Sequence, residues 1–321
     1  MSQRTKINFY CSVISKENYN KGGNFYSFGP NFGEQEKPKD VEWVYGGGIQ
    51  ECALKKAQPL NENEVDVTIF TEKDLMSPFV DLVNTKYKIG VINECKEVHP
   101  FILDVTKHIE HKFDYIFTND ADLLSRGDKY VFIDPLGANT SFKYAEQRIY
   151  EKSKLVSLIA SKKGHMKFHK QAKHAGGSTR GHRLRHIIVD FMKDKKYDVD
   201  LWGRGYKPFA RHTEALKDYC FSVSIINSRE KNYFGSYPLD CFRTGTVPIF
   251  WGCPNIGEFF NEKGILHFNT GAEFEKIMES LSVDLYKNML PHIEDNFQRV
   301  QKYNCIDNNL FDTINKTLKL R

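Results

Sequence analysis

Short apolar runs, separated by polar turns and longer amphipathic stretches, recur along most of the chain. Runs rich in β-branched and aromatic residues predict strands, and apolar residues spaced three to four apart predict helices. In the first half we expect strands at 6–14, 65–70, 87–92, 115–118 and 130–133, and helices at 74–84 and 100–108. Residues 15–48 are rich in Gly, Asn and aromatic residues, and the glycines at 46–48 predict a turn.

A second series of the same kind begins near residue 154. We expect its strands at 154–160, 199–202, 221–226, 247–251 and 265–268, and its helices at 184–192, 237–243, 273–281, 283–303 and 309–318. Alternating strands and helices predict parallel, doubly wound sheets, and 321 residues suffice for two domains. We therefore expect an N-terminal Rossmann-like domain at 1–150, a C-terminal one at 151–305, and a helix within 306–321 that packs back on the first domain.

The composition, 40% hydrophobic and 27% charged residues, is that of a soluble globular protein. No apolar run approaches the roughly 20 residues that span a bilayer, and the N-terminus lacks the apolar core of a signal peptide. The seven cysteines are scattered without a C-x-x-C pair, which argues against a zinc ribbon or a disulfide framework. We expect a cytoplasmic protein of bacterial or viral type.

The net charge of +5 is unevenly distributed. Residues 161–186 contain eight Lys or Arg, five His and no acidic residue, which predicts an anionic partner or a solvated basic face. A nucleic-acid-binding module is the alternative that this block raises. It lacks regular aromatic interleaving and any recognised motif, so we expect no nucleic-acid partner.

Residues 221–261 predict a strand, a polar loop, a short helix, a tight turn and a second strand. Open α/β sheets bind ligands at the loops that follow such strands. The residues that stand out are Asn227-Ser228, Tyr233, Thr246-Val247-Pro248-Ile249 and Trp251-Gly252-Cys253-Pro254. In order and spacing this segment resembles the donor-binding motif of the family 10 glycosyltransferases, the α-1,3/4-fucosyltransferases.

The resemblance implies an α/β, GT-B-like fold in which two Rossmann-like doubly wound domains face a central cleft. It also implies an inverting, metal-independent glycosyltransferase without a cofactor. The donor would be a nucleotide sugar, GDP-linked, carrying fucose or another deoxyhexose, and the acceptor an oligosaccharide or glycan. The chain departs from the family at Gly235-Ser236-Tyr237, where the family has Thr-Glu-Lys. That Glu and Lys are associated with the nucleotide's ribose and phosphates.

Glu94 is the expected catalytic base, because it follows the strand at 87–92 and such positions face the ligand crevice. Its context, Ile92-Asn93-Glu94, resembles the family's Gly-Glu-Asn segment, and Glu97 is the nearest rival. Arg185, or Arg183 if the helix starts earlier, is the expected diphosphate ligand, because guanidinium groups bind phosphate oxygens in pairs.

Asn227 and Tyr233 flank the expected donor loop. Ser236 stands where the family has Glu and would hold a hydroxyl of the ribose or sugar, whereas Tyr237 does not restore the charge of the family's Lys. The charge of the missing Lys would be supplied by a nearby cation, and the sequence does not distinguish among the candidates Arg229, Lys231, Arg243, Lys162 and Lys163.

Asp120-Ala121-Asp122 is a D-x-D triplet, the metal signature of another glycosyltransferase fold. It raises a metal-dependent glycosyltransferase as an alternative. Histidines 165, 169, 174, 182 and 186 lack the spacing and the acidic or Cys partners of a metal site. We therefore expect no metal.

Overall fold

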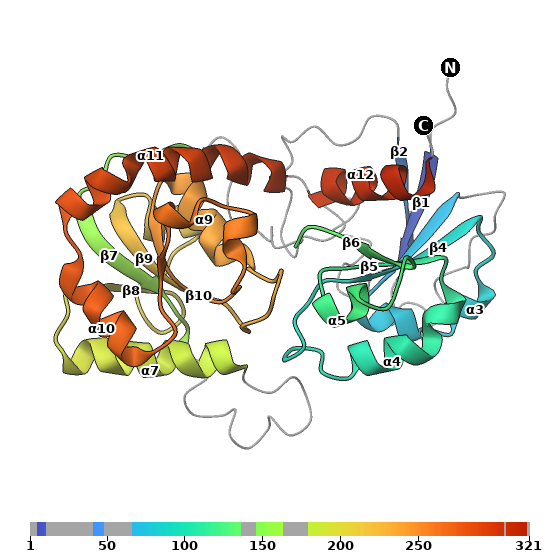
Figure 1. Ribbon diagram of the computed structural model, residues 1–321, viewed down its shortest axis with the longest axis horizontal. Coiled ribbons are helices and arrows are strands. Elements are labelled where there is room, and N and C mark those ends of the chain that lie inside the picture. Colours follow the sequence, from blue (N-terminus) through green and yellow to red (C-terminus); the bar gives the residue numbers. More distant parts are fainter. Residues whose placement is uncertain are drawn as a thin grey trace. The chain divides into compact units, whose positions relative to one another are not determined.

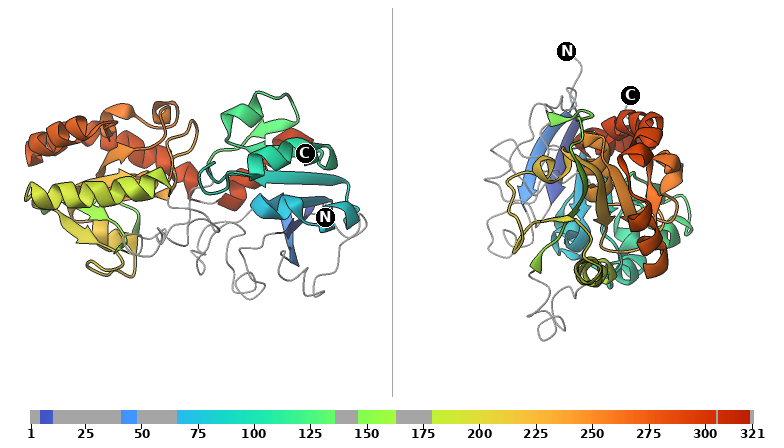
Figure 2. Two further views of the ribbon diagram at one scale, coloured as in Figure 1. Left: turned by 90° about the horizontal axis from the view of Figure 1, so that it is seen from below. Right: turned by 90° about the vertical axis from the view of Figure 1, so that its left-hand side faces the viewer.

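The computed structural model describes residues 5–10, 41–47, 66–135, 146–162, 179–304 and 306–319. The chain divides into two compact units, one of residues 1–139 and 305–321 and the other of residues 140–304. Each unit is built around one parallel sheet with helices against it (Figures 1 and 2). The expected α/β class with two parallel sheets is therefore confirmed.

The first unit contains a six-stranded sheet in the order β2-β1-β3-β4-β5-β6, with every neighbouring pair parallel. Its strands are β1 (Thr5–Tyr10), β2 (Val41–Gly47), β3 (Val67–Thr71), β4 (Tyr87–Ile92), β5 (Tyr115–Thr118) and β6 (Tyr130–Phe132). Its helices are η1 (Glu72–Met76), α3 (Phe79–Leu82), α4 (Ile102–Ile109), η2 (Glu110–Lys112), α5 (Ala121–Leu124) and α12 (Ile306–Leu318).

Successive residues of these strands enter two different cores, as the two-residue period of a strand requires. Ile69 belongs to a cluster with Leu310 and Ile314 of α12, whereas its neighbour Phe70 packs with Leu75 and residues of α3, α4 and α5. In Figure 1, α12 accordingly lies on one side of this sheet, and α4 and α5 lie on the other.

The second unit contains a five-stranded parallel sheet in the order β11-β10-β9-β7-β8. Its strands are β7 (Lys154–Ile159), β8 (Asp200–Trp202), β9 (Tyr219–Ile225), β10 (Val247–Trp251) and β11 (Leu266–His267). Its helices are α7 (Arg180–Asp194), α8 (His212–Leu216), α9 (Ser236–Thr244), η5 (Ile256–Glu258), η6 (Glu262–Gly264), α10 (Gly271–Ser280), α11 (Val283–Arg299) and η7 (Val300–Tyr303). In Figure 1, α7 and α9 lie on opposite sides of the sheet.

Lys152 is a half-buried lysine at the amino end of β7, where α8 and α9 end. Its Nζ donates to the carbonyl oxygens of Lys217 (3.1 Å) and Thr244 (2.8 Å) and to Thr246 Oγ1 (3.0 Å). Carbonyl groups at helix C-termini lack partners within the helix, so this Nζ satisfies one carbonyl at the end of α8 and one at the end of α9. Burial lowers the pKa of Lys152 to about 7.

Some elements differ from the sequence-based expectation. The expected helix at 74–84 is divided into η1 and α3 at Ser77, which is extended (φ −64°, ψ 138°) because the residue before a proline avoids helical dihedrals. Strand β2 and helices α5 and α8 were not expected, and β2 includes Gly46 and Gly47, where a turn was predicted. Within the described ranges, no helix has both the length and the apolar character to cross a membrane.

Candidate functional site

The carboxyl ends of β9 and β10 and the first turns of α7 and α9 meet at one edge of the second unit's sheet. This is the edge at which open parallel sheets bind their ligands. Most of the donor-site residues expected from the sequence lie here, on α7, on α9 or in the loop between β9 and α9.

Gly181 brings the start of α7 against the end of β9. Its backbone N–H donates to the carbonyl oxygen of Asn227 (2.9 Å), and a Cβ at this position would lie only 1.7 Å from the carbonyl oxygen of Ile226. No residue with a side chain fits this contact without displacing the helix. Glycine at this position therefore allows the start of α7 to approach the end of β9 this closely.

Arg185 lies one turn after Gly181 and points in the same direction, which makes it a buried cation at the sheet edge. Its Nε donates to the carbonyl oxygen of Ile225 (2.8 Å), and its Nη2 donates to Oδ1 of Asn227 (3.0 Å). Two of its five N–H groups are used in this way, and neither bond involves Nη1. The guanidinium is thus held rigidly while part of its fork remains for an anionic ligand.

An aromatic and ionic network continues from Arg185 through α9 and α8. The Arg185 guanidinium lies 5.3 Å from the ring centre of Tyr237, and the His212 imidazole stacks on that ring at 5.8 Å and 15°. His212 Nδ1 lies 2.7 Å from Oδ2 of Asp240, which is fully buried. The other carboxylate oxygen, Oδ1, accepts from Nη1 of the buried Arg243 (3.0 Å).

The loop between β9 and α9 is held to the loop that follows β10. Asn232, at a positive φ of 63°, donates its N–H to Oδ1 of Asn255 (2.8 Å), and Asn255 Nδ2 donates to Oδ1 of Asn232 (2.8 Å). Gly235 precedes α9 at φ 61° and ψ −169°, a conformation open mainly to glycine. Ser236 then begins α9, so its backbone lies at the electropositive helix end.

The sequence-based candidates therefore separate into groups. Arg185 contacts both Asn227 and Tyr237, and Ser236 precedes Tyr237 in the same helical turn. Tyr233 is buried within the loop. Arg183 is exposed and lines a cavity of about 370 Å³, with Phe191, Trp251 and the start of α10.

Among the proposed compensating cations, Arg243 is occupied in the core. Its guanidinium is 1% exposed and also donates to the carbonyl oxygen of Tyr303 (3.0 Å). Arg229 and Lys231 are exposed loop residues, and the Lys162 ammonium lies 4.8 Å from the ring centre of Tyr206. Lys163 and most of the basic block, residues 163–178, lie outside the described residues.

In the first unit, Glu94 occupies the loop after β4, at the carboxyl edge of that sheet. The Cys95 N–H donates to Glu94 Oε1 (2.9 Å), and Glu72 Oε1 accepts the N–H groups of Asn93 (2.8 Å) and Glu94 (3.1 Å). Glu72 sits at a positive φ of 49°, which is uncommon for a residue with a side chain. Glu97 follows in the next turn and is partly exposed.

The D-x-D triplet is arranged around a lysine. Lys96 Nζ lies 3.1 Å from Oδ2 of Asp120 and 2.5 Å from Oδ2 of Asp122. Partial burial opposes its charge, but the hydrogen bonds to Asp122 and Asp120 outweigh burial and raise the pKa of Lys96. Asp120 also caps α5, since its Oδ1 accepts the N–H of Leu123 (2.9 Å). Both carboxylates are thus engaged by protein groups.

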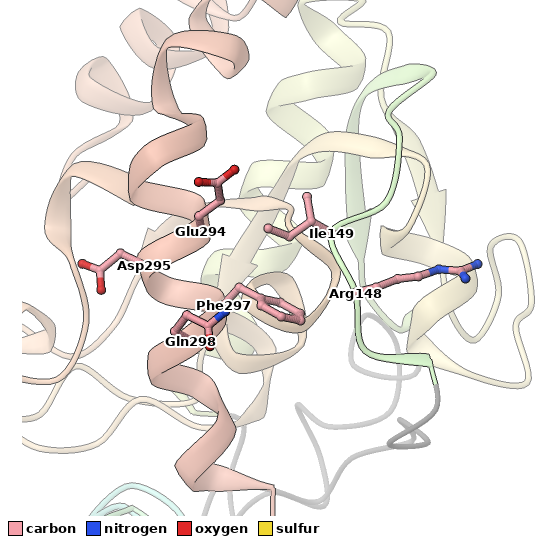
Figure 3. Close-up of a pocket in the computed structure, with 6 residues that line it drawn as sticks. All are labelled: Arg148, Ile149, Glu294, Asp295, Phe297 and Gln298. Atoms are coloured by element: carbon pink, nitrogen blue, oxygen red, sulfur yellow. The ribbon is translucent and has the colours of Figure 1, made fainter.

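A second cavity, of about 520 Å³, lies between α11 and the segment at 146–150 (Figure 3). Its lining residues are Arg148, Ile149, Glu294, Asp295, Phe297 and Gln298. Figure 3 shows Arg148 pointing away from the two α11 carboxylates. The cavity shares no lining residue with the Arg185 site.

The residues of these arrangements that were missed from the sequence include Glu72, His212, Asp240 and Asn255. Asp240 carried a usable signal, because an acid three positions before Arg243 in an otherwise apolar helix suggests a buried pair. The other three depend on contacts between segments 21 to 28 residues apart, which no local pattern reveals.

Comparisons with known proteins agree with this description. No family model matches the chain. A curated relative, α-(1,3)-fucosyltransferase FucT of Helicobacter pylori, is 26% identical over 66 residues, which span 21% of this chain and 14% of the relative. An α1,3-fucosyltransferase solved with GDP has a TM-score of 0.53 at 12% identity, covering 99% of this chain and 92% of that one. The same enzyme type solved with GDP-fucose has a TM-score of 0.50 at 14% identity, covering 98% and 90%.

The structural likeness extends over almost the whole chain, whereas the sequence likeness is confined to a short stretch. The fold predicted from the sequence, a GT-B-like pair of parallel α/β units, is confirmed by these matches together with the two sheets. The chain is thus similar in fold to α1,3-fucosyltransferases along almost its whole length, and similar in sequence to one of them over 66 residues.

Proposed function

We propose that this protein is an inverting glycosyltransferase that moves a sugar from a nucleotide-sugar donor to a hydroxyl of a saccharide acceptor, without a metal ion. The observation that carries the proposal is the buried Arg185, whose guanidinium is fixed by Ile225 and Asn227 at the ligand-binding edge of the sheet. A fixed guanidinium at this edge suits the oxygens of a diphosphate.

The donor that we propose is GDP-linked, with fucose or another deoxyhexose as its sugar. Support comes from the similar α1,3-fucosyltransferases, which were solved with GDP and with GDP-fucose. The diphosphate would bind Arg185, and the amide of Asn227 and the hydroxyl of Ser236 would hydrogen-bond nucleotide or sugar hydroxyls. No further cofactor is required, because the energy of transfer resides in the sugar–phosphate bond.

In the proposed reaction, the Glu94 carboxylate takes the proton of the acceptor hydroxyl as its oxygen attacks the anomeric carbon. The bond between this carbon and the diphosphate oxygen breaks, and its electron pair leaves with the nucleoside diphosphate. Arg185 stabilises the negative charge that develops on the departing phosphate. Attack opposite the leaving group inverts the anomeric configuration.

The contacts of Lys96 favour the metal-independent reading over the alternative based on Asp120 and Asp122. Its ammonium already pairs with both of the carboxylates that a shared divalent cation would bind. Full transfer activity in EDTA is the expected result, and activity restored only by added Mn²⁺ or Mg²⁺ would support the metal-dependent alternative.

The experiment that tests the proposal compares Glu94→Gln with its neighbour Glu97→Gln, using radiolabelled GDP-fucose and a panel of glycan acceptors. The Glu94 variant should bind GDP-fucose normally and lose transfer by at least a hundredfold, since general-base catalysis contributes about 10²- to 10⁴-fold. The Glu97 variant should remain active. Near-normal turnover of the Glu94 variant would remove this residue from the mechanism.

The nucleotide is tested separately by thermal shift with GDP-, UDP-, CMP- and dTDP-sugars. A ligand that binds the native state raises the melting temperature by mass action. A shift with GDP-sugars alone is expected. A shift with none of them would contradict a nucleotide-sugar donor.

A further inference from the structure

We propose that His212 is a positioning residue for the anion-binding guanidinium of Arg185, acting through the ring of Tyr237. The inference deepens the proposed function and rests on it, because it assumes that Arg185 binds the donor's diphosphate. It assigns a role to a histidine that lies on a different helix from every expected donor-site residue.

The first step is the contact between Arg185 and Tyr237. Hydrogen bonds to Ile225 and Asn227 hold the Nε and Nη2 atoms, and the ring of Tyr237 lies 5.3 Å from Cζ. A guanidinium is attracted to an aromatic ring. The ring therefore supplies a third constraint on the guanidinium, from a separate helix, and its position affects the direction in which the remaining N–H groups point.

The second step is the contact between Tyr237 and His212. The two rings are almost parallel, at 15°, with centres 5.8 Å apart. On its other contacts, His212 meets the ring of Phe209 edge to face at 5.2 Å. Tyr237 is thus packed between the guanidinium that it positions and a ring that is itself packed.

The third step is the anchor behind His212. Asp240 is fully buried, and its two oxygens are shared between His212 (2.7 Å) and Arg243 (3.0 Å). Arg243 is fixed in turn by the carbonyl oxygen of Tyr303 and by Oδ1 of Asn304. A buried carboxylate paired with a buried arginine is difficult to move, because losing that arginine would leave a charge uncompensated away from water. The imidazole orientation is therefore defined by the core of the unit.

This arrangement has a local consequence for donor recognition. Ser236 and Tyr237 offer no charge at the start of α9, and among the described residues Arg185 is the buried cation at this edge of the sheet. Its placement matters, because a guanidinium binds an anion best when two of its N–H groups align with two phosphate oxygens.

The alternative is that His212 only packs α8 against α9. The two roles are separated by a double-mutant cycle between His212→Ala and Arg185→Lys, with GDP-fucose binding measured by calorimetry. Lysine keeps the positive charge but lacks the planar fork that Tyr237 contacts. If His212 acts through Arg185, His212→Ala should weaken binding about tenfold in the wild-type background and less than twofold in the Arg185→Lys background.

Two further variants complete the test. His212→Phe keeps a ring packed between Tyr237 and Phe209 and leaves Asp240 paired with Arg243, so we expect it to bind within about threefold of the wild type, even if the alanine variant folds poorly. His267→Ala removes a histidine that also packs on an aromatic ring of this unit, Phe250 at 6.0 Å, and should leave GDP-fucose affinity unchanged.

The outcomes distinguish this inference from the function on which it rests. A wild-type protein that does not bind GDP-fucose overturns the proposed donor, and the inference with it. A wild-type protein that binds, with additive effects of His212→Ala and Arg185→Lys, overturns the positioning role alone. A His212→Phe variant as weak as the alanine variant also overturns it.

Discussion

Substituting alanine for Gly181 should destabilise the protein, although the same change usually stabilises a helix. Alanine in place of glycine favours a helix interior by about 1 kcal/mol. Here the new Cβ would lie 1.7 Å from the carbonyl oxygen of Ile226, whereas real Cβ contacts essentially never fall below 3.0 Å. The start of α7 must therefore retreat by about 1.3 Å, the difference between these two distances.

The loss of unfolding free energy caused by this displacement of α7 can be approximated. The 2.9 Å hydrogen bond from Gly181 to Asn227 would be lost, at about 1 kcal/mol, and overpacking typically costs a further ~1–3 kcal/mol. After the helix gain is subtracted, the net loss of unfolding free energy is about 1–3 kcal/mol. Because Arg185 lies one turn further along the same helix, affinity for GDP-fucose should fall as well.

Urea denaturation and calorimetric titration with GDP-fucose measure the two effects. Gly271→Ala is the matched control, since Gly271 also lies in the first turn of a helix but a Cβ added there would meet no described atom within 4 Å. We expect the control to be neutral or slightly stabilising. A Gly181 variant as stable as the control would show that this helix–strand contact does not constrain α7.

Three further predictions concern the charged groups. The pKa of Lys152 is about 7 in the folded protein, whereas an unfolded lysine has a pKa near 10.4. Between these pH values the unfolded state binds more protons, so the free energy of unfolding rises with pH. Relative to Lys152→Met, the wild type should gain about 2 kcal/mol from pH 7 to 9 in urea titrations. A flat difference would contradict this. Glu72→Ala, which removes the acceptor for two N–H groups beside Glu94, should lower kcat about tenfold without weakening GDP-fucose binding. Asn255→Ala should weaken GDP-fucose binding several-fold by releasing Asn232, and unchanged affinity would disconnect this loop from the donor site.

The strands were predictable because their signal is local. The runs at 87–92, 115–118 and 247–251 match β4, β5 and β10 residue for residue. Failures occurred where tertiary contacts decide the conformation. Strand β2 includes two glycines, which disfavour strands, and it forms through pairing with β1, for example Trp43 opposite Ile7.

The candidate site divides in the same way. The sequence named Arg185, Asn227 and Tyr237 as candidates, and the fold brings Asn227 and Tyr237 against Arg185; their role in binding stays a prediction. It did not separate Arg185 from Arg183, because the direction of a helical side chain depends on where the helix begins. Gly181 decides this, since its contact with Ile226 turns Arg185 inward and leaves Arg183 exposed. Partners such as His212 and Glu72 could not be predicted, because only the folded sheet brings them near.

Helix α12 covers one face of the first unit's sheet, yet it follows the entire second unit in the sequence. During synthesis, the ribosome therefore completes the second unit before it makes the residues that seal Ile7, Ile69 and Val91. Until α12 is made, the apolar face of the first unit's sheet is exposed in the nascent chain, and chaperones bind such exposed apolar surfaces. The unit whose synthesis begins first is therefore the last to receive all of its residues.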